Sequence, residues 1–173
     1  METFLWVVVS SGSVLFIVFL AICIYLYSDP LLGFKTALVT FFGGFTITML
    51  KIIYKIPRPY WIDSGIKGKL CDLDFSGPSD HSFMICFFYT YVTIIFFERY
   101  IEKPKHTLTI ILMGGIVLLW ILTSLSLSYF GSTYLIESMI GGTFGFLYTL
   151  GLLYFDNHIH DLIEKTGFIV KES

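Results

Sequence analysis

The stretch FLWVVVSSGSVLFIVFLAICIYLY, residues 4–27, contains no charged side chain and is long enough to cross a lipid bilayer. A spanning helix needs about 20 mostly apolar residues, because the hydrocarbon core offers no partners for backbone N–H and C=O groups. The run ends at Ser28-Asp29-Pro30, where proline cannot continue a helix. These residues predict a first membrane-spanning helix over 4–27.

Four further apolar runs follow along the chain. They predict spans over about 31–50, 81–97, 108–127 and 135–155. A polar loop over 51–80 separates the second span from the third, and a polar tail covers 156–173. We therefore expect a single all-α domain, an integral multi-pass membrane bundle of about five helices.

The composition agrees with a membrane protein and argues against other classes. Of the 173 residues, 55% are hydrophobic and only 14% are charged, and the mean hydropathy is +0.79. Soluble domains carry about 25% charged residues. The formal net charge of −2 provides no basic surface for nucleic acid, so we expect no nucleic-acid partner.

The sequence predicts no metal site and no cofactor. Its three cysteines lie far apart and imply neither a disulfide framework nor a metal cluster. His158, His160 and Asp161 are residue types that bind metals, but a surface helix would point them in different directions, and no fourth ligand is evident.

Five passes would bring the long loop, the start of the third span and the segment near Gly131 to one membrane face, where three motifs occur. They are Lys51-x6-Arg58-Pro59, then Pro78-Ser79-Asp80-His81, then Ser126-Leu-Ser-Tyr-Phe-Gly-Ser-Thr-Tyr-Leu-Ile-Glu137. The set resembles the type-2 phosphatidic acid phosphatase (PAP2) superfamily. The pattern of that family is Lys-x6-Arg-Pro, Pro-Ser-Gly-His and Ser-Arg-x5-His-x3-Asp. The resemblance covers roughly residues 51–142.

The resemblance implies a phosphate site built from the first two motifs. Lys51 and Arg58 would bind phosphate, Ser79 and nearby backbone amides would donate hydrogen bonds, and His81 would protonate the leaving oxygen. Simpler roles stay open: basic residues often anchor helix ends at the interface, and His81 can be an ordinary residue at a helix N-terminus.

The third motif departs from the family pattern. Leu127 stands at the position of the second arginine, Thr133 at that of the nucleophilic histidine, and Glu137 at that of the aspartate. Without the histidine the covalent step is lost, and the Thr133 hydroxyl would need a base, for which Glu137 is the nearest candidate. In the second motif Asp80 replaces glycine and places negative charge beside the phosphate site.

These departures predict a phosphatase-like pseudoenzyme. It would act as a structural subunit of a larger membrane complex, or bind membrane lipids through their phosphorylated headgroups. The alternative is an active lipid phosphate or polyprenyl diphosphate phosphatase with an altered nucleophile. Two structural expectations accompany this reading: Gly141, Gly142 and Gly145 form a close helix contact, and Tyr60 and Trp61 pack at the membrane interface.

Overall fold

The computed structural model describes residues 2–63, 65–66, 68, 73–100 and 106–165, without the side chains of 99, 100, 106 and 157–165. Within these ranges the chain forms helices, turns and loops, with an isolated bridge between Ile56 and Gly77 and no strand. The elements are α1 (Glu2–Ser10), α2 (Val14–Tyr27), α3 (Pro30–Tyr54), α4 (Pro59–Ile62), α5 (Asp80–Met84), the π-helix η1 (Ile85–Tyr89), α6 (Thr90–Tyr100), α7 (His106–Tyr129) and α8 (Leu135–Lys165). The predicted all-α class is confirmed.

The number of candidate spans agrees with the expected bundle of about five helices. Among the described residues, four helical segments are long and apolar enough to cross a membrane: Pro30–Tyr54, Asp80–Glu98, Thr107–Tyr129 and Leu135–Asp156. α1 and α2 make a fifth if the bent pair is counted as one span. We treat the chain as a multi-pass membrane protein.

The first predicted helix is not continuous. The chain bends by 59° between α1 and α2, so two helices occupy the region where one helix over 4–27 was expected. The break lies at Ser11-Gly12-Ser13, where a Cβ on Gly12 would come within 2.8 Å of the His81 carbonyl oxygen. Ser13 then caps α2 by accepting a hydrogen bond from the Phe16 N–H at 3.3 Å. Serine hydroxyls compete for backbone groups and favour such helix starts.

Two other helices differ from the sequence expectation: the last helix is longer, and the polar loop contains a short one. α8 continues to Lys165, so the first part of the polar tail extends the last helix beyond Asp156, where the candidate span ends. The polar loop contains the short helix α4, whose Trp61 ring lies 6.2 Å from the Phe75 ring and 6.2 Å from the Tyr60 ring. Cys71 and its neighbours at 69–72 lie outside the described residues.

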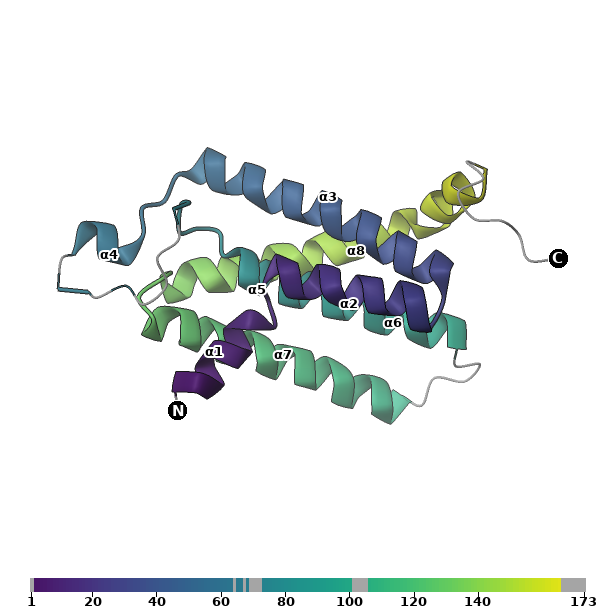
Figure 1. Ribbon diagram of the computed structural model, residues 1–173, viewed down its shortest axis with the longest axis horizontal. Helices are drawn as coiled ribbons and strands as arrows, with labels where there is room; N and C mark the ends of the chain where they lie inside the picture. The colour runs from purple at the N-terminus through teal and green to yellow at the C-terminus, as the bar shows by residue number, and fades with distance from the viewer. Residues whose placement is uncertain (1, 64, 67, 69–72, 101–105, 166–173) are drawn as a thin grey trace.

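The bundle gathers its loops at two ends (Figure 1). The end of α3, α4, the start of α5 and the turn from α7 to α8 lie together at one end. At the opposite end, Lys35 of α3 pairs with Asp156 of α8 at 2.6 Å, and the Tyr91 hydroxyl of α6 donates to Asp156 at 3.1 Å. This buried contact ties three helices together far from the motif residues.

Glycines allow α8 to pack directly on the helix that follows the second motif. A Cβ on Gly141 would lie 2.4 Å from the Ser79 carbonyl oxygen, and a Cβ on Gly145 would lie 2.5 Å from that of Phe83. Gly142 lies against the Trp120 ring, where a Cβ would approach to 2.2 Å. The predicted close helix contact is confirmed, and it fixes the distance between the second and third motifs.

We expect Gly145→Ala to lower stability, because backbone atoms of the neighbouring helix cannot move aside as a flexible side chain can. Overpacking of this kind costs about 1–3 kcal/mol. Gly151→Ala is the matched control on the same helix, since nothing lies within 4 Å of its Cβ position, and there alanine should add up to about 1 kcal/mol through helix propensity. Thermal unfolding of both variants in the same detergent measures the difference. Equal shifts would contradict the close contact.

Candidate functional site

Lys51 and Arg58, the cations of the first motif, are buried at the loop end of the bundle. Lys51 lies in the last turn of α3 and Arg58 directly precedes α4. They are only 5% and 2% exposed. Such burial does not fit interfacial anchors that extend to water, and buried charges need partners.

Asp74, a residue that the sequence reasoning did not single out, is the partner of both cations. The Lys51 ammonium lies 2.5 Å from Asp74 Oδ2, and Arg58 forms an ion pair with Asp74 Oδ1. The Arg58 Nε also donates to the Asp74 backbone carbonyl at 2.7 Å. One carboxylate therefore bridges the two cations.

The second motif supplies another carboxylate to the same lysine. Asp80 Oδ1 lies 3.1 Å from the Lys51 ammonium and 3.2 Å from Nδ1 of His81. Asp80 opens α5, directly after the N-cap residue Ser79. The negative charge that replaces the family's glycine at position 80 is thus in contact with Lys51.

The third motif joins this network through Ser132 and Glu137. Arg58 donates to the Ser132 hydroxyl at 2.7 Å and to its carbonyl at 3.2 Å. The Glu137 carboxylate accepts from the Ser76 hydroxyl and, at 3.3 Å, from the Tyr134 N–H. The Ser79 N–H donates to the Glu137 carbonyl at 3.3 Å. The fold therefore brings all three motifs together from distant parts of the sequence.

Thr133 stands at the family's nucleophile position, and among the described residues no base forms a hydrogen bond with its hydroxyl. Its hydroxyl is buried without a hydrogen-bond partner in this part of the chain, and the same holds for the hydroxyls of Ser79 and Ser128. Glu137, the candidate base, is instead engaged by Ser76 and Tyr134. Within the described residues, the Thr133 hydroxyl and the Glu137 carboxylate therefore share no hydrogen bond.

Leu127, at the family's second arginine position, belongs to an apolar cluster and not to the polar network. It is 1% exposed and packs with Val9 of α1 and with Phe130, with Leu5 at the edge of the cluster. The Phe130 ring lies 5.2 Å from that of Trp6. This cluster holds α1 against α7.

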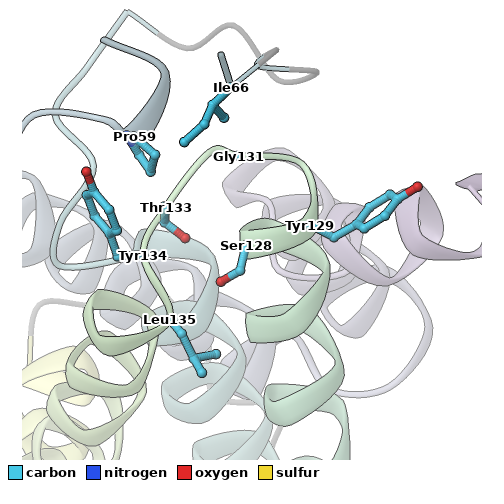
Figure 2. Close-up of a pocket in the computed structure, with 8 residues that line it drawn as sticks. All are labelled: Pro59, Ile66, Ser128, Tyr129, Gly131, Thr133, Tyr134 and Leu135. Atoms are coloured by element: carbon cyan, nitrogen blue, oxygen red, sulfur yellow. The ribbon is translucent and has the colours of Figure 1, made fainter. Parts of the chain in front are cut away.

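A cavity of about 430 Å³ lies beside the network, between α4 and the turn from α7 to α8 (Figure 2). Its lining residues are Pro59, Ile66, Ser128, Tyr129, Gly131, Thr133, Tyr134 and Leu135. Of the residues that the sequence proposed for the site, Thr133 alone lines this cavity. Figure 2 shows the hydroxyl groups of Thr133 and Ser128 turned toward each other.

Within the described residues, no group of three histidine, cysteine or acidic side chains is placed to hold a metal ion. The side chains of His158, His160 and Asp161 lie outside this part of the structure.

The fold and site define a class, the multi-pass helical membrane proteins that gather a lysine, an arginine and a helix N-terminus at one end of the bundle. A model of the PAP2 superfamily matches residues 32–160, and the protein belongs to that superfamily. No curated protein and no solved structure matches the chain.

Proposed function

We propose that this protein is a non-catalytic member of the PAP2 superfamily that binds a lipid headgroup at its remodelled site. The observation that supports the proposal is that the Thr133 hydroxyl has no hydrogen-bonded base among the described residues to remove its proton. A hydroxyl nucleophile requires an adjacent base to remove its proton, and Glu137, the only acidic residue of the third motif, is held by Ser76 and Tyr134. The covalent step that defines phosphatases of this kind has no nucleophile here.

The carboxylates beside Lys51 and Arg58 also support a non-catalytic role. In a phosphatase, fixed positive charge stabilises the negative charge that develops on the transferring phosphoryl group. Here Asp74 bridges Lys51 and Arg58, and Asp80 contacts Lys51 as well. A phosphorylated substrate would have to displace Asp74 and would still meet the negative charge of Asp80. His81, the leaving-group acid implied by the resemblance, would then have no reaction to assist.

We expect the purified protein to show no turnover of phosphatidate, lysophosphatidate, sphingosine phosphate or polyprenyl diphosphate. Phosphate release from lipid micelles, compared with the Thr133→Ala variant, measures this. The two proteins should give the same background rate, because the Thr133 hydroxyl is not activated. Turnover by the wild type that Thr133→Ala abolishes would establish the alternative, a phosphatase with a threonine nucleophile.

A role as subunit of a membrane complex is a second candidate, and one feature of α7 favours it. This helix is the least buried of the four long spans, and nothing lies within 4 Å of the Cβ positions of Gly114 and Gly115. Outward glycines let a second membrane helix approach closely. Purification from the native membrane in a mild detergent tests it: a partner in fixed stoichiometry, lost in a Gly114→Leu, Gly115→Leu variant, supports the subunit role.

A further inference from the structure

A short segment of the polar loop, Asp74-Phe75-Ser76, contacts both buried cations and is called the strap below. The Asp74 carboxylate pairs with Lys51 and with Arg58. The Asp74 backbone carbonyl also accepts a hydrogen bond from Arg58 Nε at 2.7 Å. The strap therefore binds the cations through its main chain as well as through a side chain.

The Asp74 carboxylate is the solvent-facing member of this ion-paired group. Its side chain is 49% exposed, whereas those of Lys51 and Arg58 are 6% and 3% exposed. A half-exposed carboxylate is screened by solvent and gains little from its ion pairs, so its return to water costs little. The cations differ, because a buried charge without a partner is strongly unfavourable. Asp74 should therefore leave the cations only in exchange for another anion.

The other end of the strap is held by Glu137, which stands at the position of the family's aspartate. The Ser76 hydroxyl donates to the Glu137 carboxylate, and the Ser76 N–H donates to the Ile56 carbonyl at 2.9 Å. The next residue, Gly77, packs so closely that a Cβ on it would lie 2.8 Å from the Glu137 Cγ. Ser76 is fully buried, so these hydrogen bonds are shielded from water. The hydrogen bond between Ser76 and Glu137 acts as a latch that keeps Asp74 near the cations.

The strap lies at the level of the bundle where lipid headgroups are expected. Lys51 is in the last turn of the span Pro30–Tyr54, and the next span begins at Asp80. Figure 1 shows the loop between them at the end of the bundle where α3 ends and α5 begins. Headgroups lie directly outside the hydrocarbon core that the spans cross. A phosphate group on a lipid can therefore approach the strap from the bilayer surface.

Building on the proposed headgroup-binding function, we infer that the strap is an autoinhibitory contact, in which Asp74 occupies the cations until a lipid phosphate group displaces it. Lys51 and Arg58 then exchange one oxygen anion for another, and the latch sets the fraction of molecules with an open strap. A ligand that needs a minor state binds more weakly in proportion to the population of that state. A headgroup held at the bilayer surface has a high effective concentration, whereas millimolar free phosphate leaves the strap closed.

Removal of the latch tests the inference without a change in Asp74 or the cations. Ser76→Ala should raise the affinity for dioleoylphosphatidate about fivefold or more, since one hydrogen bond contributes about that factor. Native mass spectrometry of the full chain in phosphatidylcholine nanodiscs measures the binding. Thr40→Val is the matched control and should leave the affinity unchanged. It removes a similarly buried hydroxyl that bonds to the Thr36 carbonyl of its own helix at 2.7 Å.

Hydrogen exchange of the wild-type protein provides a readout that a purely structural role of Ser76 would not change. An occupied ligand site ordinarily exchanges more slowly, but phosphatidate should speed exchange in peptides that contain the Ser76 N–H, because binding releases the strap. Nanodiscs without phosphatidate, in millimolar inorganic phosphate, form the second arm and should show no change. The two arms distinguish a lipid headgroup from free phosphate, and neither depends on the folding of a variant.

The outcomes separate this inference from the proposed function. Slower exchange of the strap on phosphatidate binding, or a Ser76→Ala variant with the affinity of the wild type, overturns the inference and leaves headgroup binding in place. Faster exchange in inorganic phosphate overturns the assignment of a lipid as the displacing ligand. Phosphatidate that does not bind above the phosphatidylcholine background even in Asp74→Asn, where the competing charge is removed, overturns headgroup binding itself.

Discussion

Asp74→Ala should lower the free energy of unfolding by about 2–4 kcal/mol, one of the two largest effects expected in this protein. Breaking a buried ion pair costs about 3–5 kcal/mol when the remaining charge is left unpaired, and here Lys51 keeps its contact with Asp80. The Lys51 and Arg58 side chains are only 6% and 3% exposed, whereas that of Asp74 is 49% exposed. The loss expected here is smaller than for a fully buried pair because solvent screens the Asp74 carboxylate. Thermal unfolding in detergent provides the measurement.

Asp63→Ala is the control for the Asp74 variant. Asp63 is an exposed carboxylate of the same loop and accepts a hydrogen bond from the Gly65 N–H at 2.8 Å. Its loss should change stability by less than about 0.5 kcal/mol, as is usual for surface substitutions. A similar loss in both variants would show that Asp74 does not neutralise the two cations.

Binding of inorganic phosphate provides a second test of the contact between Asp74 and the two cations. If Asp74 occupies the place of a phosphate group, the Asp74→Ala variant leaves two cations at the right spacing for one. Millimolar phosphate should then raise the unfolding temperature of the variant, since a ligand that binds only the folded state stabilises it. The wild type should not respond. A wild type that responds as strongly as the variant would argue against internal occupation of the site.

Leu127→Arg should be as damaging, with an expected loss of about 3–5 kcal/mol, because it places an uncompensated charge in an apolar cluster. Leu127 is 1% exposed and packs with Val9 and Phe130. Leu127→Met is the control: it conserves volume and should cost less than about 1.5 kcal/mol. Unfolding of both variants in the same detergent measures the effect. An arginine variant as stable as the methionine variant would mean that position 127 can reach the polar network.

The burial of Leu127 also affects variants in which the residues of the family motif are restored. Thr133→His, Leu127→Arg and Asp80→Gly together would restore the family residue at three of the four departing positions and leave Glu137 unchanged. The new arginine would disrupt the contact between α1 and α7, and Asp74 would still occupy both cations. We therefore expect this triple variant to remain inactive. Activity in it would show that neither Asp74 nor the α1 contact blocks the site.

Much of the fold could be predicted from the sequence, because bilayer thickness alone sets the length of an apolar run that can span it. The same argument failed at Ser11-Gly12-Ser13, where the sequence looks like one long span and the structure bends by 59°. That bend depends on the close approach of Gly12 to the His81 carbonyl, 69 residues away in the sequence. Apolar composition does not report such a contact.

The sequence by itself determined the membrane-spanning class, the family resemblance, and the absence of a histidine at position 133. These depend on residue type and spacing, which can be counted along the chain. Only the tertiary structure decided what the remaining residues do. The path of the loop brings Asp74 to Lys51 and Arg58, and the packing of α1 encloses Leu127. Charge neutralisation and burial depend on distances between segments far apart in sequence, and those distances exist only once the helices have packed.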